Sequence, residues 1–103
     1  MKYMICYITA SSKKEAQKIA AHLLEKRLIA CSNMFPCSSK YWWKGKIQQS
    51  EEILIFCKTT SNHTKQIIEE VKKIHSYDVP CINFLPITKG NPDYLKWIEN
   101  EVG

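Results

Sequence analysis

The sequence predicts an α+β protein of the ferredoxin-like type: a βαββαβ core with an antiparallel sheet, an extra C-terminal helix, and a long hairpin between the second and third strands. Three observations predict this fold. β-rich segments and helical periodicity alternate in that order, three of the four prolines fall in or beside two of the four strands, and 103 residues with 45% hydrophobic composition are enough for one core. We therefore expect a single domain that spans residues 1–103.

The first strand and the first helix follow directly from local signals. Residues 2–9 are rich in β-branched and aromatic side chains and contain no breaker, which predicts a strand. Ser12 and Glu15 then form a capping box, which is typical of a helix start. Apolar residues at helical spacing continue from there to Arg27, which predicts a helix of about four turns.

A long hairpin is predicted next. Residues 28–43 have strand composition, with an expected interruption at Pro36. Residues 44–46, Lys-Gly-Lys, are a turn signal, and residues 47–60 form the expected return strand.

The second half of the chain predicts helix, strand and helix. A Thr/Ser/Asn cluster at residues 60–62 precedes an apolar stripe of helical period that ends near His75. A fourth strand is expected at residues 81–87, and Asn91-Pro92 is a strong helix start, with Asn91 as the cap.

The prolines test the topology independently. In a βαββαβ sheet the first and third strands are central and the second and fourth are edges. Proline cannot donate a ladder hydrogen bond, so it is confined to edges. Pro36, Pro80 and Pro86 lie in or beside the second and fourth predicted strands, as this topology requires.

Composition and charge limit the possible classes of protein. The net charge is +5, but the lysines are dispersed, which indicates a solvated surface and no nucleic-acid partner. No apolar run approaches the roughly 20 residues of a membrane helix, so we expect no membrane association. The first residues alternate like a strand and no cleavage region follows them, so we expect a cytoplasmic protein.

The five cysteines agree with a reducing compartment. Their number is odd and no C-x-x-C pair occurs, so neither a complete disulfide set nor a zinc ribbon is indicated. Most of them lie in apolar, strand-like sequence, where cysteine behaves as a small buried hydrophobe.

Both faces of the predicted sheet are apolar. The first strand has Tyr3, Ile5 and Tyr7 on one face, and Met4, Cys6 and Ile8 on the other. Two helices cover one face, so we expect the second face to contact another subunit, the alternative being coverage by the third helix and the chain ends. Consecutive aromatic residues at 41–43 in the hairpin support self-association, because a two-stranded arm has no core of its own.

No catalytic motif is present, so we expect no enzyme and no organic cofactor. The chain has no Gly-rich phosphate loop and no G-x-S-x-G sequence. His22 lies in the middle of the first predicted helix and needs no function, and His63 is interpreted as an exposed residue in the first turn of the second helix.

The segment that begins at His75 is the candidate metal site. His75 is followed within six residues by Asp78 and Cys81, and imidazole, carboxylate and thiolate are common ligands of zinc and copper. The H-x-x-D-x-x-C spacing matches no structural zinc pattern, so a helix end capped by His75 is the competing interpretation.

Three stretches of the sequence resemble the CutA divalent-cation tolerance family over residues 9–102: TASSKKEAQKIAAHLLEKRLIACSN, YWWKGKIQQSEEILIFCKTT and HSYDVPCINFLPITKGNPDYLKWI. The YWW-x-GKI and G-N-P-x-Y-L-x-W blocks carry the resemblance most specifically. The resemblance implies a ferredoxin-like fold, a homotrimer similar in architecture to the PII-type signalling proteins, binding of copper or other divalent ions, and no established catalysis.

The family's H-P-Y-E-x-P-E segment corresponds here to residues 75–81, HSYDVPC. His75, Tyr77 and Pro80 match the family pattern, while Cys81 stands where the family has a suspected glutamate ligand. We therefore predict His75 and Cys81 as metal ligands. Exchange of a carboxylate for a thiolate favours soft ions, Cu(I) above all.

Two alternatives remain open at this point. A PII-like small-molecule sensor would use clefts between subunits, with Lys58 and Tyr77 as candidate ligand-binding residues. An RNA-binding module is the third class, because the βαββαβ scaffold also serves RNA recognition, but the chain lacks an RNP-type pattern.

Overall fold

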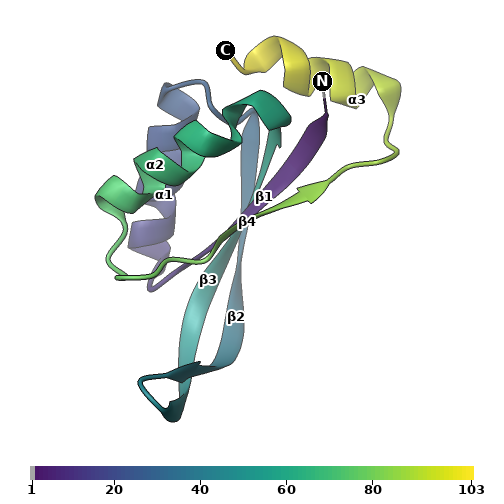
Figure 1. The fold of residues 1–103 in the computed structure, drawn as a ribbon. Helices are drawn as coiled ribbons and strands as arrows, with labels where there is room; N and C mark the ends of the chain where they lie inside the picture. Colours follow the sequence, from purple (N-terminus) through teal and green to yellow (C-terminus); the bar gives the residue numbers. More distant parts are fainter. Residues whose placement is uncertain (1) are drawn as a thin grey trace.

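The computed structural model describes residues 2–103 as a four-stranded antiparallel sheet with three α-helices (Figure 1). The elements are β1 (Tyr3–Ala10), α1 (Lys13–Glu25), β2 (Cys31–Trp43), β3 (Lys46–Thr60), the short 3₁₀ helix η1 (Ser61–His63), α2 (Thr64–Ile74), β4 (Ile82–Pro86) and α3 (Pro92–Glu101). The sheet order is β2-β3-β1-β4, so the predicted ferredoxin-like fold is confirmed, with β2 and β4 at the edges.

Local sequence signals account for where the helices begin. The Ser12 hydroxyl accepts a hydrogen bond from the Glu15 amide at 3.1 Å, which confirms Ser12 as the N-cap of α1. The Asn91 side chain accepts from the Asp93 amide at 3.1 Å, and Pro92 occupies the first turn of α3.

The core lies between the sheet and the pair α1 and α2. It is built from small and aliphatic side chains on alternate strand positions, which pack against the inner faces of both helices. Ile8 and Ile55 face each other across β1 and β3, and Leu23 and Val71 close the core from the helices; all four are fully buried.

The opposite face of the sheet, here called the open face, consists of Tyr3, Ile5, Tyr7, Leu54, Phe56, Lys58 and their register partners Phe35 and Leu85. Rings from three adjacent strands follow one another across it. The Tyr7 and Phe56 rings are 6.3 Å apart, and the Phe35 and Phe56 rings are 5.5 Å apart in edge-to-face geometry.

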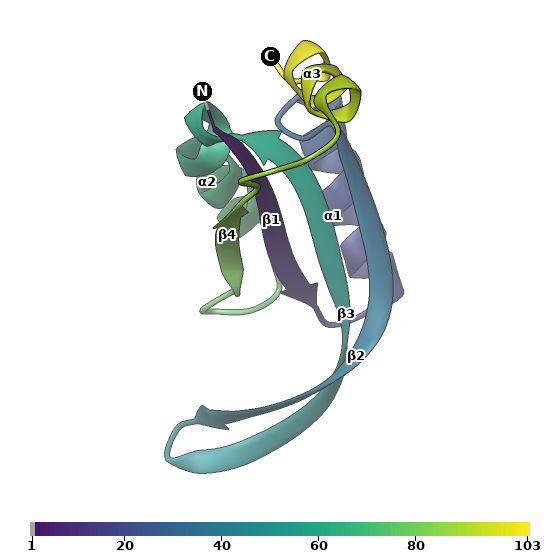
Figure 2. The same ribbon diagram turned by 90° about the vertical axis from the view of Figure 1, so that its right-hand side faces the viewer.

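Helix α3 is linked to one end of this face. The Tyr3 hydroxyl donates to Glu99 at 2.7 Å, and the Cys31 thiol lies 3.3 Å from the Tyr94 hydroxyl. Figures 1 and 2 show α3 at the end of the sheet opposite the hairpin tip, so the rest of the open face has no helix over it.

The β2–β3 hairpin extends beyond the other two strands and curves (Figure 2). Both turn residues, Lys44 and Gly45, have positive φ, 51° and 78°. This is the conformation of a two-residue hairpin turn that matches the strand twist, and it explains the glycine.

Two predictions about individual residues are wrong. The strand is not interrupted at Pro36, because β2 is an edge strand and tolerates a missing donor there. His63 is not exposed: it is only 9% accessible, because η1 folds it inward before α2 begins.

Candidate functional site

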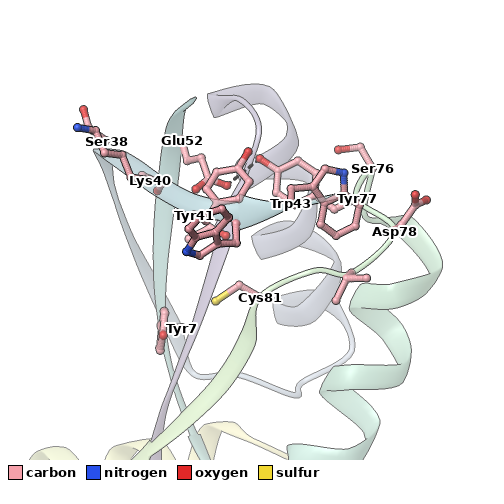
Figure 3. A pocket seen from close by; sticks show the side chains of 14 residues that line it. Tyr7, Ser38, Lys40, Tyr41, Trp43, Glu52, Ser76, Tyr77, Asp78 and Cys81 are labelled. Atoms are coloured by element: carbon pink, nitrogen blue, oxygen red, sulfur yellow. Dashed lines mark hydrogen bonds between the residues drawn. The ribbon is translucent and has the colours of Figure 1, made fainter. Parts of the chain in front are cut away.

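A groove of about 970 Å³ lies on the open face, beneath the curved hairpin. β1, β2 and β3 and the segment 76–81 line it. Figure 3 shows Tyr41 and Trp43 of the hairpin close to Glu52 and Tyr77, with the Cys81 sulfur on the side towards Tyr7. The complete lining is Tyr7, Thr9, Ser38, Ser39, Lys40, Tyr41, Trp42, Trp43, Glu52, Ser76, Tyr77, Asp78, Val79 and Cys81.

The turn after α2 is fixed to the sheet by the His75 side chain, which is fully buried. The Nδ1 atom accepts a hydrogen bond from the Tyr77 amide at 3.1 Å, so the ring proton lies on Nε2. Nε2 donates to the Thr9 carbonyl at 2.8 Å. Both ring nitrogens are therefore occupied, and His75 holds Tyr77 at the rim of the groove.

Glu15 attaches the same turn to the start of α1. One carboxylate oxygen accepts from the amide and the hydroxyl of Ser11, at 2.9 and 2.8 Å, and the other accepts from the Ser76 amide at 2.7 Å. Burial opposes ionisation of this carboxyl, but the hydrogen bonds from Ser11 and Ser76 outweigh it and lower its pKa to about 2. The ionised Glu15 carboxylate therefore holds the turn after α2 against the start of α1, at the base of the site.

Glu52 and Tyr77 form the polar centre of the groove. Glu52 is 7% exposed, and its carboxylate accepts a hydrogen bond from the Tyr77 hydroxyl at 2.7 Å. Burial raises the pKa of Tyr77, and the hydrogen bond to Glu52 raises it further, so the hydroxyl keeps its proton and acts as a donor.

The residues predicted from sequence occupy two different places. Tyr77 and Cys81 line the groove, and His75 lies behind it as the anchor of the turn. Lys58 lies outside the groove lining, where its ammonium group contacts the Asn33 side chain. Within one chain, Lys58 and Tyr77 do not line the same groove, and their predicted place in a cleft between subunits stays a prediction.

The donor set for a metal ion is incomplete within one chain. Residues 2–103 contain no group of three or more His, Cys, Asp or Glu side chains placed to hold an ion. His75 has no free lone pair, and the Cys81 thiol is 3.3 Å from the Asn83 amide nitrogen, which donates to it. One copy does not form a metal site in this arrangement, so His75 and Cys81 as ligands stay a prediction.

Sequence reasoning missed Glu52 and the second role of Glu15. The capping box identified Glu15 only as part of the start of α1, although its carboxylate reaches residue 76. No sequence signal marks Glu52, because its contact with Tyr77 depends on the curvature of the hairpin and spans 25 residues.

The family model for the CutA1 divalent ion tolerance protein matches residues 4–101. The divalent-cation tolerance protein CutA of Archaeoglobus fulgidus is 47% identical over 96 residues, covering 93% of this chain and 94% of its own. That of Thermotoga maritima is 39% identical over 99 residues, covering 96% and 98%.

Solved structures agree closely with this fold. The A. fulgidus protein, described as a periplasmic divalent cation tolerance protein, superimposes with a TM-score of 0.96 at 44% identity and covers 98% of this chain and 99% of its own. CutA1 from Oryza sativa superimposes with a TM-score of 0.96 at 36% identity, covering 100% of this chain and 95% of its own.

Proposed function

Because the chain belongs to the CutA1 divalent ion tolerance family, we propose that it is a non-enzymatic homotrimer that binds metal ions, copper among them. The observation that carries the assembly is the open face. Its aromatic row from Tyr7 through Phe56 to Phe35 is apolar, and Phe35 and Leu85 remain 44% and 47% exposed in a single chain. Contiguous apolar surface of this kind marks a protein interface.

Light scattering of the purified protein tests the assembly. Phe35→Asp places a charge on the open face, and we expect the mass to fall from that of three chains to that of one. Leu24→Asp is the matched control, because Leu24 is similarly exposed, at 40%, but lies on α1. A wild-type protein that is monomeric at micromolar concentration refutes the proposal.

Metal binding has separate support. The family is described by its tolerance of divalent ions, which supports an interaction with metal ions. Cys81 contributes a thiol to the groove lining, and a thiolate ligand favours a soft ion such as Cu(I). Since one chain offers an incomplete donor set, the proposed site needs a donor from a second copy or an opening of the turn that frees His75.

A titration of reduced protein with Cu(I) and with Zn(II) tests this part. We expect Cys81→Ser and His75→Ala to weaken Cu(I) binding, whereas Cys37→Ser leaves it unchanged. Cys37 is the matched control, since it is a partly exposed free thiol like Cys81 but lies on β2, outside the groove lining. Unchanged affinity in both test variants contradicts the assignment.

The cytoplasm is the proposed location, supported by the five free cysteines. No helix within residues 2–103 combines the length and apolarity that a bilayer crossing needs. Fractionation of cells that express the untagged protein decides the compartment.

A further inference from the structure

The two helices that cover the core carry most of the net charge of the chain. Residues 13–27 and 64–74 contain eight of the fifteen lysines and arginines but four of the ten acidic residues, so they contribute +4 to a net charge of +5. The lysines are dispersed along the sequence, but the fold collects them in one layer, because α1 and α2 lie on the same face of the sheet (Figure 1). All eight cationic residues are exposed: Lys13, Lys14, Lys18, Lys26, Arg27, Lys65, Lys72 and Lys73.

Two of the four glutamates of this layer are used inside the protein. Glu15 is held by the hydrogen bonds from residues 11 and 76 described above. Glu70 is only 7% exposed and accepts from the Lys73 ammonium group at 2.9 Å. Glu25 and Glu69 are the exposed acidic residues that remain, so the surface of the layer is more cationic than its composition indicates.

Basic side chains follow one side of α1 at a spacing of four residues. They are Lys14, Lys18, His22 and Lys26, and we call them the cationic ridge. Residues four apart on a helix lie on one side of it, about 6 Å apart along the axis, so the ridge is about 18 Å long. His22 and Lys26 lie 2.8 and 3.9 Å from the carboxylate of Glu70 on α2, which places the ridge along the line where the two helices meet.

The ridge has a cost that no contact within the chain offsets. Among residues 2–103, neither Lys14 nor Lys18 forms an ion pair. Like charges four residues apart destabilise a helix. An anion that contacts both ammonium groups would remove this repulsion, so the arrangement favours an anionic partner that extends along the helix.

The composition of the layer restricts what this partner is. Residues 13–27 and 64–74 contain no Phe, Tyr or Trp, so they offer no platform on which nucleic-acid bases could stack. The apolar sides of both helices are buried in the core, so they are not available to enter a bilayer. Seven of the eight cations are lysines, and a lysine binds phosphate as a point charge without bidentate geometry. These features favour a linear polyanion that is recognised by its charge alone.

We propose that the cationic ridge binds inorganic polyphosphate, a linear phosphate polymer without bases, which lies along the line between α1 and α2. Phosphate groups of the polymer contact the ammonium groups of Lys14, Lys18 and Lys26, and the release of counterions drives binding. The ridge is on the side of the sheet opposite the open face, so association through the open face leaves it accessible. The site is additional to metal binding and uses neither His75 nor Cys81.

The test is fluorescence anisotropy of a labelled linear polyphosphate, titrated with the wild-type protein in metal-free buffer at several salt concentrations. We expect saturable binding, with log K falling linearly with log salt concentration at a slope of about −2 to −3, because three lysines contact the polymer. The double variant Lys14→Gln/Lys18→Gln is expected to weaken binding by about tenfold or more and to reduce the slope by about two.

A matched variant separates the ridge from net charge. Lys89→Gln/Lys96→Gln removes the same charge from exposed positions outside α1 and α2, and we expect polyphosphate binding close to that of the wild type. Urea unfolding checks that the ridge variant is folded. Its free energy of unfolding should be unchanged or higher, because glutamine is a good helix former and the repulsion between the two lysines is removed.

Three results would overturn the proposal: no saturable binding at low salt, binding that does not depend on salt, or equal weakening by the ridge variant and its control. Tighter binding of single-stranded RNA or of anionic phospholipid vesicles than of polyphosphate also overturns it, because the ridge then has a partner of another class. None of these results alters the mass measured by light scattering or the Cu(I) affinity, so the proposed function is judged separately.

Discussion

Glu15 is the residue whose replacement tests the architecture of the site most directly. Its carboxylate connects the start of α1 to the turn that carries His75 and Tyr77. We predict that Glu15→Gln lowers the stability of the folded protein at neutral pH. The variant keeps one acceptor oxygen, but it loses the charge that Ser11 and Ser76 stabilise.

The magnitude follows from the pKa of Glu15, which falls from 4.5 in a free chain to about 2 in the folded protein. At about 1.4 kcal/mol per pKa unit this amounts to about 3 kcal/mol. Contact of the remaining 11% of the side chain with solvent reduces it to about 2 kcal/mol. Because the folded-state pKa is the lower one, this stabilisation is complete above pH 4.5 and is lost as the pH falls towards 2.

Urea unfolding at pH 7 and at several values between pH 5 and 2 measures the effect, at one fixed protein concentration because an oligomer's stability depends on it. We expect the difference between wild type and Glu15→Gln to be largest at pH 7 and to shrink below pH 4.5. Glu69→Gln, on the exposed side of α2, is the control and should show little difference. A Glu15→Gln difference that is independent of pH refutes the assignment of the stabilisation to the charge.

Three further substitutions are predicted to destabilise the protein, each measurable by urea unfolding. Leu23→Ala opens a cavity at a fully buried core position, at a cost of about 3 kcal/mol, whereas Leu24→Ala on the exposed side of α1 costs little. Thr59→Val keeps the shape but removes the buried hydroxyl that donates to the Leu28 carbonyl at 2.7 Å, a loss of about 1–3 kcal/mol. Gly45→Ala is expected to lower the free energy of unfolding by about 1 kcal/mol, because φ at this residue is 78°. An unchanged free energy of unfolding would contradict the explanation of this glycine by its positive φ.

The topology was predictable because several local signals agree on it. Helical periodicity, the caps at Ser12 and Asn91, and the placement of prolines all indicate the same order and the same edge strands. The signal at Pro36 was interpreted too strongly, since a proline interrupts a ladder only where its amide would have donated.

The burial of His63 and the construction of the groove were not predictable for a different reason. His63 is not part of the repeating apolar pattern that predicts buried helix positions, and its burial depends on the path of η1 between β3 and α2. The Glu52–Tyr77 contact joins the middle of β3 to a turn 25 residues later, and only the curvature of the hairpin brings them together. Periodicity reports which side of an element is apolar, but it does not report how far a strand bends.

The distribution of large side chains links this fold to its proposed partners. The buried core of residues 2–103 contains aliphatic, alanine and cysteine side chains, and none of its members is Phe, Tyr or Trp. Most aromatic residues lie instead on the open face, on the hairpin and on α3, where they keep contact with solvent, whereas Phe84 of β4 packs against the edge of the core. Aromatic side chains contribute most per residue at interfaces and ligand sites. A chain of 103 residues that leaves most of its aromatic side chains outside the core keeps these large apolar groups available for contact with a second copy on the open face.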